Sequence, residues 1–265
     1  MRIRSSSRWL HGLSFLAGTA LLGLAACGGV DSQYVDEALD SAETAQSQSA
    51  LLVPATSDAQ NGMSADQIAA NAATKADTYY QPKGCVTATA NGPSVVYKLK
   101  DCTGPHGLVH VTGTVTVLFS VAGDGVHATA TAEDIKVNGG VIDVDAAAVY
   151  TVNGQTKKLQ VTSSSSGSGI RGNYFTHTGA YVATWDATCM TLDGAWQTKA
   201  GGYTWSTTVA NYKRCSGMCP AAGGSVVYAG GVSDLTVTIT FDGSGTAKWA
   251  NSRGRAGNVI VNCAQ

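Results

Sequence analysis

The sequence is poor in the residues and motifs that mark many enzymes. Its 265 residues include five histidines and four phenylalanines, and charged side chains make up 13% of the chain. No G-x-x-x-x-G-K-[ST] loop, no strand–G-x-G-x-x-G–helix pattern and no G-x-S-x-G elbow occurs. These absences argue against a nucleotide-binding domain and against an α/β-hydrolase. The scarcity of phenylalanine also argues against a large ligand cavity with aromatic walls.

Neither sign of charge dominates the body of the chain. From Lys75 onward there are 14 Lys and Arg against 11 Asp and Glu, an excess of three. Two small basic clusters occur, Lys213-Arg214 and a group made of Lys248, Arg253 and Arg255. They fall short of the basic footprint that a nucleic-acid interface needs. We therefore expect no nucleic-acid partner.

One long apolar run is present, and it lies at the N-terminus. Three arginines precede an apolar stretch over residues 13–26, and Cys27 follows it directly. A charged start, a short apolar core and small residues before a cleavage site are typical of a secretory signal. The stretch falls short of the ~20 residues that a membrane-spanning helix needs. Residues 1–26 are therefore predicted to be a signal peptide.

The end of this run, Leu24-Ala25-Ala26-Cys27, resembles the signal of bacterial lipoproteins. The resemblance implies that Cys27 is lipidated, becomes the first mature residue and anchors the protein to a membrane. A diacylglyceryl group with an added N-acyl chain would hold it stably, whereas a single acyl chain binds only marginally. Gly28 stands where family members retained in the inner membrane usually have Asp, so we expect the outer membrane. The alternative is an ordinary signal peptide that leaves Cys27 as a free thiol.

Two segments precede the body. Residues 27–63 are predicted to be the lipidated N-terminus and a flexible polar tether, because they contain acids, no Lys or Arg and few large apolar residues. Residues 64–81 are predicted to form a helix that packs on a sheet. Ser64 is a suitable N-cap, Asp66 favours the first turn, and Pro82 follows the end.

From Cys85 onward the apolar pattern has a period of two, which is typical of strands with one buried face. Residues 108–121, 141–152 and 235–242 alternate in this way. Glycine pairs that favour hairpin turns fall at or near the ends of such runs: Asn91-Gly92, Asp124-Gly125, Asn138-Gly139, Asn153-Gly154, Asp193-Gly194, Gly201-Gly202 and Asp242-Gly243. We predict an all-β domain over residues 82–265, an antiparallel meander of about twelve strands. The pattern leaves open a barrel-like form or a two-sheet sandwich.

Six cysteines follow Cys27, and an even number in an exported protein predicts three disulfides; they are Cys85, Cys102, Cys189, Cys215, Cys219 and Cys263. Paired residues of a hairpin lie symmetrically about its turn. Cys85 and Cys102 are centred on the turn near Pro93, so they are predicted to pair. Cys189 and Cys215 are centred on Gly202, which favours 189–215 and leaves 219–263. A local 215–219 loop with a 189–263 bond is the alternative, and it stays open.

No arrangement of residues predicts catalysis, a cofactor or a metal. His110, His127 and His177 fall on strand-like segments and are interpreted as solvated or cross-strand residues. Asp143 and Asp145 share a strand face and could form half of a carboxylate pair, although two solvent-facing acids are the simpler interpretation. The aromatic residues of the C-terminal half either stabilise the sheet in pairs or form a binding patch; they are Trp185, Trp196, Trp205, Trp249, Tyr174, Tyr181, Tyr203 and Tyr212.

The body also resembles bacterial lipoproteins of unassigned activity that carry cysteine-framed, Thr/Val/Gly-rich hairpins. The resemblance lies in Cys85 with Asp101-Cys102-Thr-Gly-Pro, in 214–220, and in Phe241-Asp-Gly with Asn262-Cys263. We expect a lipid-anchored envelope protein with a non-enzymatic structural or binding role. A carbohydrate- or lipid-binding module is the alternative, and a hydrolase is less favoured. Its partners are then the membrane at Cys27 and an envelope protein, glycan or lipid.

Overall fold

The computed structural model describes most of the chain from residue 62 onward. The described ranges are 62–103, 110–137, 139–153, 156–168, 174–186, 188–215, 217–231, 234–261 and 263, with positions 34–35, 38–39, 41–42, 52–53, 55–56 and 59 before them. The predicted signal peptide at 1–26 and the predicted lipidation site Cys27 lie outside these residues.

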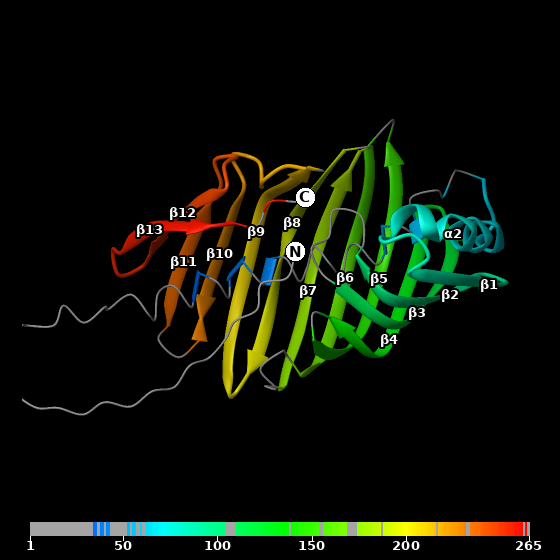
Figure 1. The fold of residues 1–265 in the computed structure, drawn as a ribbon, viewed down its shortest axis with the longest axis horizontal. Helices are drawn as coiled ribbons and strands as arrows, with labels where there is room; N and C mark the ends of the chain where they lie inside the picture. The colour runs from blue at the N-terminus through cyan, green and yellow to red at the C-terminus, as the bar shows by residue number, and fades with distance from the viewer. Residues whose placement is uncertain are drawn as a thin grey trace, which may run out of the picture.

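Thirteen antiparallel strands form one sheet in which every strand pairs with its neighbours in sequence (Figure 1). The helix α2 spans Ala65–Tyr79. The strands are β1 Val86–Asn91, β2 Ser94–Thr103, β3 His110–Ala122, β4 Gly125–Val137, β5 Gly140–Asn153, β6 Thr156–Ser168, β7 Tyr174–Trp185, β8 Cys189–Ala200, β9 Tyr203–Cys215, β10 Ser225–Gly230, β11 Leu235–Thr240, β12 Thr246–Asn251 and β13 Ala256–Ile260.

The predicted all-β meander with one preceding helix is confirmed. The sheet is open, with β1 and β13 as its two edges. The sequence left open a barrel-like form or a two-sheet sandwich, and the single open sheet is neither of these. Figure 1 shows a broad curved sheet, with α2 near β1 and β2.

The helix α2 forms where the sequence predicts it. Ser64 Oγ accepts the backbone N–H of Gln67, and Gln67 Oε1 accepts the backbone N–H of Ser64 in return. This capping box satisfies two amide groups that a helix start otherwise leaves without partners. One helical face is buried, and the helix contacts β1, β2 and β3; its buried residues are Ile68, Ala69, Ala72 and Ala76.

Most strands turn one set of side chains to a buried inner face and the other set to a more exposed outer face. On β5 the residues Val144, Ala146 and Ala148 are buried, whereas Asp143 and Asp145 are exposed. The predicted alternation is confirmed along most of β3, β5 and β11. It fails near two strand ends, where Val121 and Val152 are 51% and 42% exposed.

A segment predicted to be a free tether packs on the inner face instead. The described residues between 34 and 59 are mostly helical and buried, and we call them the N-terminal segment. Tyr34 packs against Tyr228 of β10, Ser41 bonds to β8 and β9, and Ala59 lies with residues of β3 and β5 around one hollow. At these positions the expectation of a free tether is therefore wrong. The apolar residues at the start of the N-terminal segment are few and stand among acidic and polar residues, so their helical spacing is inconspicuous in the sequence. They are Tyr34, Val35, Ala38, Leu39 and Ala42.

The connections between strands alternate between two ends of the sheet. Those after β4, β6, β8, β10 and β12 lie at one end, which we call the Tyr203 end. Those after β3, β5, β7, β9 and β11 lie at the other, which we call the Asp242 end. The predicted turn at Asp193-Gly194 is wrong, because these residues lie inside β8 opposite a bulge.

Candidate functional site

The six cysteines of the body form three disulfides. Cys85 pairs with Cys102, as predicted. Cys189 and Cys215 are direct cross-strand partners on β8 and β9, with their Cα atoms 4.0 Å apart, and they form the second bond. Cys219 pairs with Cys263. The structure therefore selects the pairing centred on Gly202 and not the local 215–219 loop.

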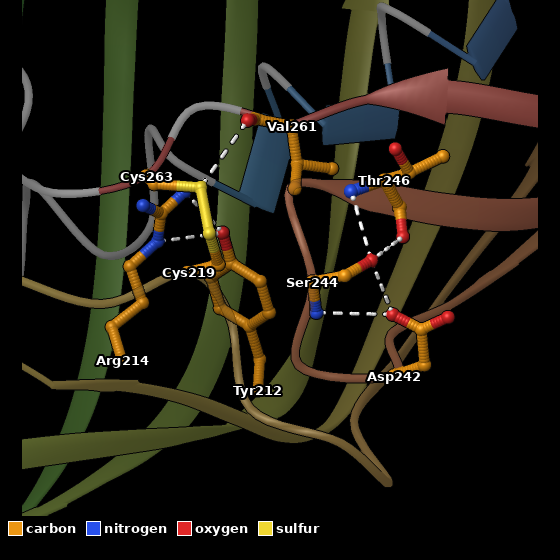
Figure 2. Close-up of a disulfide and its surroundings, with 8 residues drawn as sticks. All are labelled: Tyr212, Arg214, Cys219, Asp242, Ser244, Thr246, Val261 and Cys263. Atoms are coloured by element: carbon orange, nitrogen blue, oxygen red, sulfur yellow. Dashed lines mark hydrogen bonds between the residues drawn. A yellow bond between two sulfur atoms is a disulfide. The ribbon is translucent and has the colours of Figure 1, made fainter.

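Figure 2 shows the Cys219–Cys263 bond beside a buried arginine at the Asp242 end. Arg214 is 1% exposed, its Nε and Nη2 donate to the hydroxyl of Tyr212, and its guanidinium lies 5.5 Å from the centre of that ring. In the nearby turn, Asp242 Oδ1 accepts the hydroxyl and the backbone N–H of Ser244. These bonds lower the pKa of Asp242. Because its side chain is buried, Arg214 belongs to the core and not to a basic surface cluster.

Two histidines are hydrogen-bonded to aspartates on the surface. His110 Nδ1 lies 2.9 Å from Asp101 Oδ1, and His127 Nε2 lies 2.7 Å from Asp124 Oδ1. The hydrogen bond from His127 lowers the pKa of Asp124. No described hydroxyl or thiol is hydrogen-bonded to His127, so this Asp–His pair has no bonded nucleophile to activate.

His177 differs from these two because it is buried on the inner face. Its side chain is 4% exposed, its Nδ1 lies 3.0 Å from Thr198 Oγ1, and its ring centre is 5.9 Å from that of Trp196. Nε2 has no hydrogen-bond partner among the described residues. Burial lowers the pKa of His177 to about 4, so the ring is neutral near pH 7.

Of the two aspartates considered for a carboxylate pair, Asp143 accepts a backbone hydrogen bond. At three bulges, a residue with positive φ donates its backbone N–H to a side chain opposite it on the neighbouring strand. The donors Asp101, Asp134 and Asn211 have φ angles of 53°, 50° and 51°. Their acceptors are Thr112, Asp143 and Asp193, at 2.8, 2.9 and 2.7 Å. Aspartate and asparagine tolerate a positive φ better than most residues. Each of the three bulges therefore has an Asp or Asn as its donor. Asp145 has no such bond.

Half of the eight aromatic residues singled out in the sequence are buried rather than gathered on the surface. Trp185 packs against Tyr150 with ring centres 5.8 Å apart, and Tyr212 packs against Phe241 at 5.2 Å. Buried with them are Trp196 and Tyr181, whereas Trp205 and Trp249 are half-buried. Two members are exposed, Tyr174 at 62% and Tyr203 at 43%. Trp185 and Tyr212 therefore form aromatic pairs within the sheet, as the sheet-stabilising interpretation predicts.

The outer face carries a shallow hollow of about 440 Å³ across β4 to β8. Its apolar lining includes Ala147, Val149, Ala180 and Val182, and its polar lining includes His127, Gln160 and Asp193. Asp193 is already bonded to the backbone of Asn211. The hollow offers an apolar floor of small side chains with a few polar groups, which suits binding better than catalysis.

Two contacts at the centre of the inner face were missed by sequence reasoning. Trp196 Nε1 donates to Ser41 Oγ at 2.6 Å, and Ser41 Oγ lies 3.0 Å from Thr207 Oγ1. Ser41 and Trp196 are 155 residues apart in the chain, so no local pattern could have paired them. The helical spacing of apolar residues around Ser41 was the available signal.

Within the part of the chain that the structure describes, no cluster of His, Cys, Asp and Glu could hold a metal ion. No helix in the same part is long and apolar enough to span a membrane. No protein-family model, curated protein or solved structure matches the chain. The chain's own residues are therefore the basis for assigning a function.

Proposed function

We propose that this chain is a lipid-anchored protein of the bacterial cell envelope, held in the outer membrane through Cys27. Its body has a structural or ligand-binding role and not an enzymatic one. The observation that carries the proposal is the cysteine count. Of seven cysteines, six are joined in three disulfides within the body. The remaining one is Cys27, directly after the lipoprotein-like signal. Disulfides also favour an exported protein.

A cysteine variant tests the anchor. Cells producing the full chain are fed an alkyne fatty acid, and the protein is followed by labelling and membrane fractionation. The wild type is expected to carry the label and to pellet with the outer membrane. Cys27→Ser is expected to lose both, while Ser32→Ala keeps both. An unlabelled wild type would contradict the proposal.

A second variant tests the membrane. Gly28 follows the anchored cysteine, where the family's inner-membrane members usually have Asp. Gly28→Asp is expected to keep the fatty-acid label and to move the protein to the inner-membrane fraction of a two-membrane bacterium. Retention of Gly28→Asp in the outer membrane would overturn the sorting part of the proposal and leave lipidation intact.

The outer-face hollow supports a second candidate, a carbohydrate- or lipid-binding module. Ala180 lines the floor of the hollow, and Thr178 lies exposed on the same strand outside it. Wild type is expected to bind at least one class in screens of oligosaccharides and lipid vesicles. Ala180→Glu is expected to weaken that binding at least tenfold, and Thr178→Glu to leave it unchanged. Absence of binding by the wild type would remove this candidate.

A further inference from the structure

The strand β13 is one of the two open edges of the sheet, and half of its backbone groups point outward. The backbone N–H of Val261 and the C=O of Arg255 are hydrogen-bonded to the β12 side of the sheet. Backbone groups alternate in direction along an antiparallel strand. The N–H and C=O groups of Ala256, Asn258 and Ile260 therefore point away from β12, and no described strand lies beyond them.

Nothing within β13 blocks the approach of a further strand. Proteins usually protect an exposed edge with a charge, a proline or a bulge, and residues 256–260 contain none of these. Ile260 is 85% exposed, more than any other described large apolar side chain. At the other edge, β1 exposes Thr87, Thr89 and Asn91, and α2 packs against it. Of the two edges, β13 is therefore the better suited to pairing.

The sequence of β13 matches a second copy of itself in antiparallel pairing. When two copies are centred on Asn258, Ala256 of each copy faces Ile260 of the other, and Asn258 faces itself. This register pairs all three outward-facing residues, and each pair is joined by two backbone hydrogen bonds. Moving the centre by one residue in either direction loses one of the three pairs. The strand therefore has one preferred register with itself.

The inner-face side chains of β13 fit the same register. Gly257 of each copy faces Val259 of the other. A Cβ added at Gly257 would lie 3.0 Å from Trp249 Nε1, so the indole ring of Trp249 lies over this glycine. Trp249 and Val259 are both half-buried in the single chain. In the paired arrangement, Val259 of each copy reaches the Trp249 ring of the other, and both lose apolar surface to the contact.

We propose that two copies of this chain associate through β13, in an antiparallel pair centred on Asn258 that joins their two sheets into one. In Figure 1, β13 lies near the end of the sheet opposite α2, so the two copies extend in opposite directions from the contact. The contact is short, and we therefore expect a reversible dimer and not an obligate one.

The symmetry of this dimer is compatible with a membrane anchor but does not depend on one. The two-fold axis runs perpendicular to the joined strands, so the inner faces of both copies lie on the same side. Both N-terminal segments pack on those inner faces, and both chains can then be held by one membrane. The inference goes beyond the proposed function, because the pairing follows from β13 alone.

Opposite charges at position 258 test the pairing in the full chain purified in detergent. Asn258→Lys and Asn258→Asp each place two like charges across the axis, so each variant alone is expected to dimerise at least about tenfold more weakly than the wild type. A mixture of the two variants brings opposite charges together and is expected to restore the dimer. Thr89→Lys, at an exposed position of β1, should leave it unchanged. Light scattering over a range of concentrations measures the mass, and a non-reducing gel checks the disulfides.

Photocrosslinking tests the register independently. A benzophenone amino acid in place of Ile260 is expected to yield a covalent dimer in which two peptides that begin at Ala256 are joined, because trypsin cuts after Arg255. The same amino acid in place of Met218, which is 59% exposed and outside β13, should yield no covalent dimer.

Three results would overturn the proposal. The first is a wild type that stays monomeric at every concentration. The second is a mixture of Asn258→Lys and Asn258→Asp that fails to recover the dimer, since only position 258 faces itself in this register. The third is loss of the dimer in Thr89→Lys, which would show that β1 takes part. None of these results bears on the lipidation of Cys27, so the proposed function is tested separately.

Discussion

Asp143 and Asp145 are two identical side chains on one strand with different roles. Both lie on the outer face of β5. Asp143 Oδ1 accepts the N–H of Asp134, which has a φ of 50° at the bulge in β4. The bond provides a partner for an amide group that the ladder cannot reach at the bulge. Asp145 is exposed and has no comparable bond.

This contrast gives a first prediction. Asp143→Ala removes the acceptor and is expected to lower the free energy of unfolding by about 0.5–1 kcal/mol. Asp143→Asn keeps a side-chain oxygen and should retain most of the stability, while Asp145→Ala should change almost nothing. Urea unfolding curves measure all three. Equal losses in Asp143→Ala and Asp145→Ala would show that the bulge contact does not contribute.

His177 is a residue whose burial predicts a pH dependence. With a pKa of about 4 in the folded protein and 6.5 as its ordinary value, it stays neutral in the folded state while the unfolded chain takes up a proton between pH 6.5 and 4. Stability is therefore full above pH 6.5 and falls as the pH drops to 4. The loss amounts to about 3 kcal/mol, since each pKa unit corresponds to ~1.4 kcal/mol.

Comparing variants isolates this effect. The unfolding free energy of the wild type is expected to fall more between pH 7 and pH 4 than that of His177→Gln, by about 3 kcal/mol. His110→Gln, which changes an exposed histidine, should follow the wild type. The aspartates with lowered pKa values lose their contributions below their ordinary pKa of 3.8, outside this window. Parallel curves for wild type and His177→Gln would refute the assignment.

At the scale of elements, the β7–β8 pair is shaped by two glycines, each opposite a large aromatic. Gly179 pairs with Trp196, and Gly194 pairs with Tyr181. A Cβ at Gly179 would overlap the Cβ of Trp196, and one at Gly194 would overlap the Cβ of Tyr181. Neither glycine has a positive φ, so space and not backbone conformation requires them. The close approach of the two strands depends on these missing side chains.

Adding one methyl group tests this packing. Gly179→Ala is expected to destabilise the protein by about 1–3 kcal/mol, the usual cost of overpacking. Gly123→Ala is the matched control, because nothing lies within 4 Å of its added Cβ and its φ is not positive. It should shift stability by no more than about 0.5 kcal/mol. Thermal unfolding measures both, and similar melting temperatures for the two variants would contradict the account.

The sequence predicts those elements whose signals are local. Period-two patterns, Asx-Gly turns and the N-cap Ser64 led to the meander and α2, and hairpin symmetry led to the Cys85–Cys102 pair. Asp193-Gly194 has the composition of a hairpin turn. Its residues have other roles, because Asp193 accepts the N–H of Asn211 at the bulge in β9 and Gly194 leaves room for Tyr181. The burial of His177 and the Trp196–Ser41 bond depend on residues far apart in the chain, so no local pattern contains them.

For the whole molecule, the N-terminal segment covers the inner face of an open sheet. Val35, Ala38 and Leu52 are almost fully buried in its contact with the body. An open sheet leaves one apolar face that must be covered by another element. Here α2 and the described residues of the N-terminal segment pack on it, which couples that segment to the stability of the fold.

Loosening this segment should be measurable by proteolysis. Ser41→Ala leaves the buried Nε1 of Trp196 without its acceptor, at a cost of about 1–2 kcal/mol. A protease specific for glutamate, which has Glu37 and Glu43 as sites in this region, is expected to cut the variant roughly 5–30-fold faster. Ser120→Ala, at an exposed serine, should leave the rate unchanged. An unchanged rate in Ser41→Ala would show that the segment is held by other contacts.

Mass spectrometry of the mature N-terminal peptide decides whether Cys27 holds this body to a membrane. If Cys27 is lipidated, the mature chain begins at Cys27 and carries a diacylglyceryl group on its sulfur, with or without an N-acyl chain. A mature chain that begins elsewhere, or one that begins with an unmodified Cys27, would contradict it.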